Sequence, residues 1–262
     1  MQYQDPMQPQ DQTQYQNPVQ PPIRRSKYPF VPSPIFIRPR KAEVIFALIY
    51  LFLHFFVMGV IIAVLGEVFG LSLSPAELNL LYMGVGAIVL CVVLHRYLWV
   101  SFRQFVRHGF VANLREVGIG YGMNFFLIIP ISLLIVLLIP EVQNPNQEMI
   151  EEMIDTEFWQ TFVLAVILAP IVEEILFRGG IFAPLFRRNR ILAYAISSLL
   201  FAFVHILGAL FLVPSVGLIL IMFLYVPAGI ACAWVYERSG SIWTAIVLHM
   251  VMNLIAVLIA SA

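Results

Sequence analysis

Two adjacent glutamates and an arginine end an apolar run in the stretch PIVEEILFRGG, residues 170–180. On a helix, Glu174 and Arg178 are four residues apart with the acid first, the favourable order for an ion pair along one face. Glu173 points about 100° away from that face. Glu173 therefore lacks a neutralising partner on its own helix and needs water or a partner from another element. On this stretch alone, both acids could equally anchor a helix end at a membrane interface.

Two further polar pairs occur at a spacing of four residues. Phe201 and His205 share one helix face in FAFVH, and His249 and Asn253 share one in HMVMN. Hydrogen bonds between helices would explain each pair by itself. Together with Glu173, however, three segments of one half of the chain supply a possible base, a possible acid and neutral donors. One buried polar site is more economical than three separate structural accidents.

These motifs resemble those of the CPBP (Abi) family of intramembrane proteases, which includes CAAX prenyl endopeptidases and bacteriocin-processing or self-immunity proteins. That family carries Glu-Glu-x-x-x-Arg, Phe-x-x-x-His and His-x-x-x-Asn on successive helices, and this chain has EEILFR, FAFVH and HMVMN in the same order. The run YERSGSIWTAIVLHMVMN is also similar to the family's approach to the last motif. The resemblance covers residues 157–254, the expected protease core, and implies an intramembrane endopeptidase.

The resemblance also implies roles for individual residues. Glu173 would activate a water as the base, and His205 would hold that water or exchange its proton. His249 and Asn253 would donate hydrogen bonds to the oxyanion that forms when water adds to the scissile carbonyl. Structural support would come from Glu174, Arg178 and Phe201.

A metal ion is the open alternative. Glu173, His205 and His249 could equally provide three ligands with water in the fourth position, the usual arrangement of a catalytic zinc. The sequence has no HExxH motif, and ligands on different helices cannot be judged from their spacing. The cofactor is therefore zinc or none, and direct activation of water by Glu and His is the hypothesis we favour.

The elements that must position these residues are membrane-spanning helices. The 262-residue chain is 61% hydrophobic and only 11% charged, and a span needs about 20 apolar residues. The sequence predicts an all-α, polytopic transmembrane helical bundle with seven spans, near 43–66, 77–100, 117–139, 157–180, 191–212, 215–236 and 241–260. Only the Val-Pro-Ser corner at 213–215 divides the fifth span from the sixth.

The first 41 residues differ from the rest. They are rich in Gln and Pro, end in a basic juxtamembrane segment, and predict a disordered cytoplasmic tail ahead of a transmembrane domain at 42–262. The late basic group and the full-length span after it argue against a cleaved signal peptide. Cys91 and Cys232 fall within spans and are interpreted as small apolar residues.

The charges predict the orientation of the chain in the membrane. Lys and Arg occur at 24–41, 96–115, 187–190 and 238, which alternate with the spans and should face the cytosol. The opposite loops carry Glu67, Glu77 and the acidic stretch 140–157, which we interpret as a solvated loop or surface helix rather than a metal site. The chain is expected in a bacterial plasma membrane with its N-terminus inside and its C-terminus outside.

The depths of the candidate residues conflict in this arrangement. Glu173 lies about 8 Å inside Arg178, whereas His205 lies about 21 Å beyond Ile191, at 1.5 Å per residue. The levels match only if the fifth helix begins outside the bilayer. We therefore predict a cavity that opens to the cytosol, with cleavage near the cytoplasmic membrane face.

Two other polar residues within the predicted spans do not belong to the three motifs. His54 and Asn124 are interpreted as packing or interhelical bonds, and Gly118, Gly120 and Gly122 as sites of close helix approach.

The expected partners are a peptide or membrane-protein substrate and the lipid bilayer. A net charge of zero argues against nucleic acid. Two other functions compete: a catalytically silent scaffold or bacteriocin self-immunity protein, and a transporter, for which the chain lacks convincing inverted repeats. The substrate, any role of prenylation and the oligomeric state are not determined by the sequence.

Overall fold

The computed structural model describes residues 36–141, 143–212 and 214–262. These residues form helices and no strand, which confirms the all-α prediction. Seven helices or helical runs are long and apolar enough to cross a membrane: Lys41–Val68, Pro75–Val93, Phe110–Leu138, Pro145–Phe186, Arg190–Leu212, Val216–Ser239 and Ile242–Ala260. The chain is thus a multi-pass membrane protein, as predicted. The predicted disordered tail lies almost wholly outside the described residues and stays a prediction.

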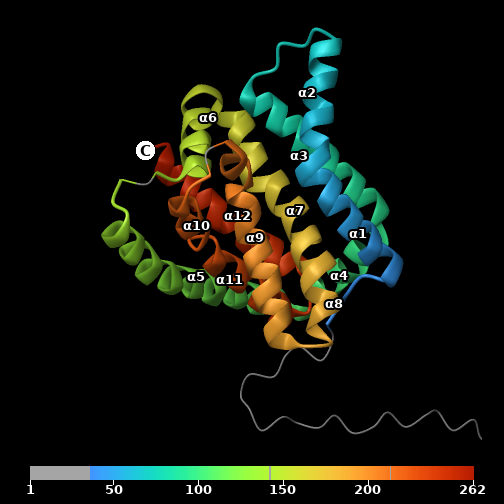
Figure 1. Cartoon of the computed structure of the whole chain (residues 1–262). Helices are drawn as coiled ribbons and strands as arrows, with labels where there is room; N and C mark the ends of the chain where they lie inside the picture. Colours follow the sequence, from blue (N-terminus) through green and yellow to red (C-terminus); the bar gives the residue numbers. More distant parts are fainter. Residues whose placement is uncertain (1–35, 142, 213) are drawn as a thin grey trace, which may run out of the picture. The chain divides into compact units, whose positions relative to one another are not determined.

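The first three spans follow one another along the chain and are labelled in Figure 1. The first consists of α1 (Lys41–Leu53), a π-helical segment η1 (His54–Met58) and α2 (Gly59–Val68). The second is α3 (Pro75–Val93), whose N-cap Ser74 and Glu77 satisfy each other's backbone N–H groups. The third is α5 (Phe110–Leu138).

The predicted second span, 77–100, is wrong at its C-terminal end. The helix breaks at Leu94, and α4 (His95–His108) follows as a separate element. Three exposed arginines, Arg96, Arg103 and Arg107, lie on α4 beside exposed apolar side chains such as Trp99. A helix of this composition lies at a membrane surface rather than across the bilayer.

The fourth run is longer than the predicted 157–180. It consists of α6 (Pro145–Phe162), η2 (Val163–Leu168), α7 (Ala169–Glu174), η3 (Ile175–Phe182) and α8 (Ala183–Phe186), with non-helical backbone angles at Glu157. The kink separates the acidic first part of α6, whose Glu148, Glu151, Glu152 and Asp155 are exposed, from the spanning part. The interpretation of the acidic stretch as a surface helix is confirmed for α6.

The last spans are α9 (Arg190–Leu212), the pair α10 (Val216–Met222) and α11 (Val226–Ser239), and α12 (Ile242–Ala260). Close packing of α11 depends on two glycines. A Cβ at Gly229 would come within 2.8 Å of Ser198 Cα in α9, and one at Gly120 within 2.5 Å of Val235. Gly118 and Gly122, also predicted to allow close approach, have no described atom within 4 Å of the point where a Cβ would lie. That prediction therefore holds for Gly120 alone.

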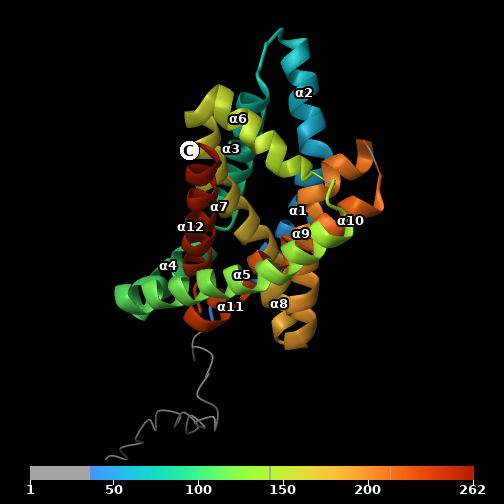
Figure 2. The same ribbon diagram turned by 90° about the vertical axis from the view of Figure 1, so that its left-hand side faces the viewer.

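The glutamate motif lies at the centre of the bundle (Figures 1 and 2). Every residue of η3 is buried, and α1, α9 and α11 pack against it. Glu174 and Arg178 are each 0% exposed. The two acids are therefore interior groups, and the alternative that they anchor a helix end at the interface is wrong.

Candidate active site

Glu174 and Arg178 form the ion pair that their spacing predicts. Arg178 Nε lies 3.1 Å from Glu174 Oε2. The guanidinium also donates to the Gly229 carbonyl at 3.0 Å and lies 4.6 Å from the centroid of the Phe201 ring. These contacts involve residues on three other helices. Arg178 therefore neutralises Glu174 and links η3 to α9 and α11.

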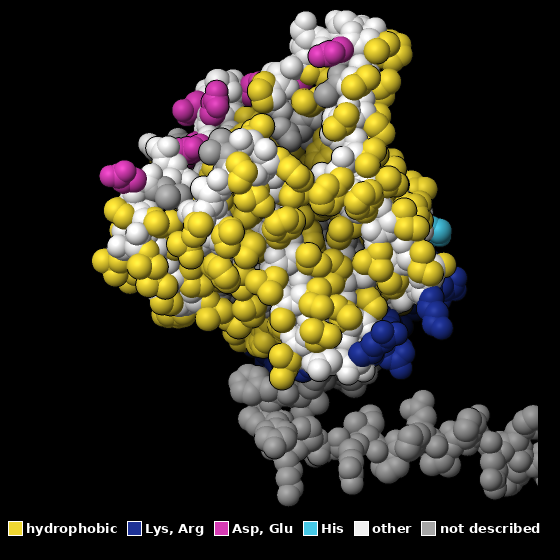
Figure 3. All heavy atoms as spheres, viewed as in Figure 1, with side chains coloured by type: hydrophobic (Ala, Val, Ile, Leu, Met, Phe, Trp, Pro, Cys, Tyr) yellow, Lys and Arg dark blue, Asp and Glu magenta, His cyan; other side chains and the backbone are white. Residues whose placement is uncertain are grey.

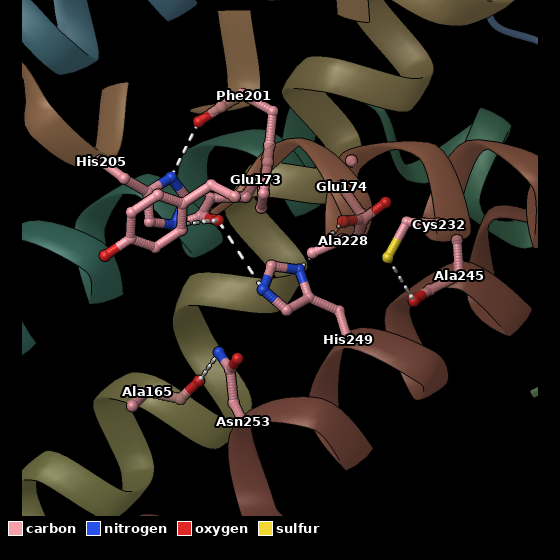
Figure 4. Close-up of polar contacts among 12 residues, drawn as sticks. Ala165, Glu173, Glu174, Phe201, His205, Ala228, Cys232, Ala245, His249 and Asn253 are labelled. Carbon is pink, nitrogen blue, oxygen red and sulfur yellow. Dashed lines mark hydrogen bonds and ion pairs between the residues drawn. The ribbon is translucent and has the colours of Figure 1, made fainter. Parts of the chain in front are cut away.

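Glu173 points away from this pair and towards two imidazole rings (Figure 4). Its Oε2 lies 4.0 Å from His205 Nε2 and 3.9 Å from His249 Nε2. This oxygen is buried and has no hydrogen-bond partner among the described residues. A buried carboxylate oxygen without a partner is costly, so the site favours a water or a cation between the three groups.

The other nitrogen of each ring is already engaged. His249 Nδ1 lies 2.9 Å from Glu174 Oε1, and His205 Nδ1 lies 2.8 Å from the Phe201 carbonyl oxygen. Both partners only accept hydrogen bonds, so each Nδ1 carries the proton and each neutral ring presents the Nε2 lone pair to Glu173. The sequence did not predict the contact between Glu174 and His249, because spacing cannot pair residues on different helices.

The conflict in depth disappears for two reasons. The His205 ring folds back one turn towards Phe201, as long side chains on helices do. The fourth helical run also continues from Arg178 to Phe186, so Arg178 does not mark the membrane surface. His205 and Glu173 therefore meet although they lie at different distances from their helix ends.

Asn253 reaches the same cavity but already makes one bond. Its Nδ2 donates to the Ala165 carbonyl at 2.8 Å (Figure 4). Ala165 lies in π-helical η2, where the regular backbone hydrogen-bond pattern is interrupted. The predicted assembly of Glu173, His205, His249 and Asn253 around one cavity is what the structure contains.

The cavity has a volume of about 480 Å³. Asn124 lines it, and its Oδ1 is buried without a hydrogen-bond partner in the described part of the chain. Of the two predicted roles of Asn124, packing or an interhelical bond, its Oδ1 makes no such bond among the described residues. His54, by contrast, packs as predicted: it is 1% exposed and stacks on Tyr82 with ring centroids 4.1 Å apart.

Tyr225 is a site residue that the sequence did not reveal. It lies in the turn before α11, and its ring stacks on His205 at 4.3 Å between centroids. Its hydroxyl donates to Asn144 Oδ1 at 3.0 Å and receives a bond from Asn146 Nδ2 at 3.2 Å. Tyr225 thus joins His205 to the loop that begins α6. No spacing in the sequence indicates this, because the turn has no helical period.

A second group of metal-ligating atoms lies next to the first. One ligand atom each of Glu174, Cys232 and His249 lies within 4.8 Å of the others. Glu174 already faces Arg178 and His249 Nδ1, so its charge is compensated. The set predicted from the sequence, Glu173, His205 and His249, does not meet this distance among the described residues, although Glu173 lacks the compensation that Glu174 has.

Comparison with known proteins agrees with the motifs. Residues 155–255 match the family model "Type II CAAX prenyl endopeptidase Rce1-like". The chain is 33% identical over 97 residues to "Putative membrane peptidase YdiL" of Bacillus subtilis strain 168, and 33% identical over 98 residues to "UPF0177 protein YajF" of Lactococcus lactis subsp. lactis strain IL1403.

These matches are partial. Each covers 37% of this chain, with 35% of the Bacillus protein and 43% of the Lactococcus protein, so this chain spans less than half of either relative's length. No solved structure gives a significant match. The matched segment contains all three motifs, and the predicted resemblance to the type II CAAX prenyl endopeptidase Rce1-like family is confirmed over residues 155–255.

Proposed function

We propose that this protein is an intramembrane endopeptidase in which Glu173 activates the attacking water. One observation carries the proposal: the unpartnered Oε2 of Glu173 lies about 4 Å from the Nε2 atoms of His205 and His249. The carboxylate and the neutral His205 ring at this separation can hold one water between them, since a water can donate to two acceptors. The match to a family of membrane peptidases supports hydrolysis over transport.

The two glutamates have different roles in the proposed reaction. Glu173 takes a proton from the water as its oxygen adds to the scissile carbonyl, and the same proton then passes to the leaving amine as the C–N bond breaks. Glu174 is the poorer base, because it forms an ion pair with Arg178 and its Oε1 lies 2.9 Å from His249 Nδ1, although its Oε2 also lacks a hydrogen bond among the described residues. His205, fixed by the Phe201 carbonyl and by Tyr225, holds the water.

His249 and Asn253 are the proposed oxyanion donors. A doubly protonated His249 would donate through Nδ1 to Glu174 and through Nε2 into the cavity. The Asn253 carboxamide has a second N–H besides the one bound to Ala165, and this N–H is the second donor. Losing one donor of this kind costs about 10²–10³ in rate.

The same residues have the ligand types of a divalent cation, but their ligand atoms would have to move closer together to hold one. Glu173, His205 and His249 supply one oxygen and two nitrogens, and both rings are oriented through Nδ1 by a carboxylate or a carbonyl, the outer arrangement usual for histidine ligands. The partnerless Glu173 Oε2 is consistent with such a ligand. A bound zinc would supply Lewis-acid activation of water at this position.

Peptide cleavage by the purified full-length chain tests the proposal. Glu173→Gln should lower the cleavage rate by about 10²–10⁴ while leaving the thermal unfolding temperature unchanged. Glu174→Gln is the matched control and should lower stability as well as rate, because it breaks the pair with Arg178. Equal effects of both variants would contradict the division of roles.

Two further measurements complete the test. Activity that is lost with a chelator and restored by zinc would assign the cation, and activity insensitive to chelation would assign direct activation. A wild-type chain that binds peptides but cleaves none, from a panel with and without lipidated C-termini, would favour the silent scaffold instead.

A further inference from the structure

The two ends of the transmembrane bundle carry opposite charge (Figure 3). One end carries every Lys and Arg of the described residues except Arg178, which is paired with Glu174 in the interior: Arg38, Arg40, Lys41, Arg96, Arg103, Arg107, Arg115, Arg187, Arg188, Arg190 and Arg238. The other end carries eight acidic residues and, within the described ranges, no Lys or Arg: Glu67, Glu77, Glu141, Glu148, Glu151, Glu152, Asp155 and Glu157. The positive-inside rule places the arginine-rich end in the cytosol.

The cavity extends from Glu173 towards the acidic end. Helices α5, α9 and α12 begin at the arginine-rich end. From α5 and α9 the lining takes residues at or beyond the middle, namely Asn124, Ile128, Ser132, Phe201, Val204 and His205, and from α12 it takes six positions from His249 to Ala260. Helix α3 and the α6–α8 run begin at the acidic end and contribute Asn79 and Met83, and positions from Gln147 to Glu173, whereas no lining residue follows Glu173 in that run. The predicted cytosolic opening is therefore not what these residues form.

The exposed residues of the lining identify the open side. Among the described lining residues, Gln147, Met149 and Ala256 are exposed, and all three lie nearer the acidic end than Glu173 does. The opposite side of the site is closed by the buried pair of Glu174 and Arg178 and by the wholly buried η3. Among the described residues, no Lys or Arg lines the cavity.

We infer that the Glu173 cavity opens to the side of the membrane opposite the cytosol. Since the opening lies beside α6 and the C-terminal half of α12, the substrate is a peptide segment on that side, such as the extracytoplasmic end of a membrane-spanning protein or a secreted peptide. The direction of the opening follows from the lining residues and the charges alone. The identity of the substrate rests on the proposed peptidase function.

Thiol labelling in intact cells tests the direction of the opening. In the full chain with Cys91→Ala and Cys232→Ala, single cysteines are placed by Gln147→Cys at the opening, Met252→Cys inside the cavity and Arg188→Cys at the arginine-rich end. A membrane-impermeant, negatively charged thiosulfonate is applied before and after permeabilisation. We expect Gln147→Cys and Met252→Cys to react in intact cells, and Arg188→Cys only after permeabilisation.

The opposite pattern would overturn the inference, and so would reaction of Met252→Cys from the cytosolic side alone. If Gln147→Cys reacts from outside and Met252→Cys reacts from neither side, the cavity is closed and the inference also fails. Labelling does not require catalysis, so these outcomes are independent of the Glu173→Gln cleavage assay. The substrate is tested by comparing cleavage of one tethered peptide on either side of the membrane, with cleavage only on the far side expected.

Discussion

At the scale of single residues, two adjacent carboxylates acquire different chemistry from what each one meets. Glu174 faces Arg178 at 3.1 Å and His249 at 2.9 Å, so its charge is compensated inside the buried core. Within the part of the chain that the structure describes, Glu173 faces the edges of two imidazole rings, about 4 Å away. One glutamate therefore holds the fold and the other is open to a reactant.

Removing Arg178 alone should be severe. Arg178→Met leaves the buried Glu174 charge with His249 as its remaining partner, and breaking a buried pair in this way costs about 3–5 kcal/mol. The double variant Glu174→Gln with Arg178→Met should recover most of that loss, because no uncompensated charge remains. Thermal unfolding in detergent measures both. A stable Arg178→Met would show that the pair does not hold η3 in place.

At the scale of elements, the candidate site depends on how helices and turns hold the His205 and His249 rings. The turn before α11 carries Tyr225, which stacks on His205 and bonds to the Asn144 loop at the start of α6. Further along α11, Gly229 allows the backbone to approach Ser198 in α9. These contacts set the distance between α9 and α11, and hence the place of His205.

Tyr225 should act as a positioning residue. Tyr225→Phe keeps the ring stack and loses the hydroxyl bonds to Asn144 and Asn146, so we expect a higher KM through the loosened loop with little change in kcat. Tyr225→Leu also loses the stack, and kcat should fall with an altered pH profile as His205 becomes free to turn. Steady-state kinetics over pH separates the two variants. Identical kinetics for both would argue against a role of the stack.

The helix contact at Gly229 predicts a second pair of variants. Gly229→Ala places a methyl group within 2.8 Å of Ser198, and such overpacking costs about 1–3 kcal/mol. Gly122→Ala is the matched control, because no described atom lies within 4 Å of its Cβ position. Thermal unfolding should show a lowered midpoint for the first variant and none for the second. An unchanged Gly229→Ala would mean that α9 and α11 separate without cost.

At the scale of the whole molecule, the two ends of the bundle differ in charge, and the proposed side of the cavity opening depends on this difference. Lys and Arg near the ends of spans set orientation, whereas Asp and Glu contribute little. The eight acids of one end would therefore be a consequence of orientation rather than its cause, and the proposed opening on the far side rests on the arginines of the other end.

Adding positive charge to the acidic end should disturb the orientation. Changing Glu148, Glu151 and Glu152 of α6 together to Lys places three positive charges next to a span, and we expect a mixture of orientations. The matched Glu→Gln triple variant should keep one orientation. Labelling of Gln147→Cys in intact cells reports the fraction of chains in each. A single orientation for the Lys triple variant would mean that the arginines of the other end dominate.

The sequence by itself determined the membrane class, the seven spans, the motif residues and the division between Glu173 and Glu174. Each of these follows from composition or from spacing along one helix, which the 3.6-residue period makes readable. Asn124 and Tyr225 show where this reading stops, because their roles depend on neighbours from other elements. Hydropathy likewise did not predict that the second span breaks at Leu94 or that the fourth helical run continues to Phe186.

Only the tertiary structure decided how the site is arranged between helices. It brought His249 against Glu174, turned His205 back towards Phe201, and lined the cavity with residues towards the acidic end of the bundle. The physical reason is that contacts between helices depend on tilt, side-chain rotamer and helix length. None of these leaves a period in the sequence, whereas the pattern along a single helix does.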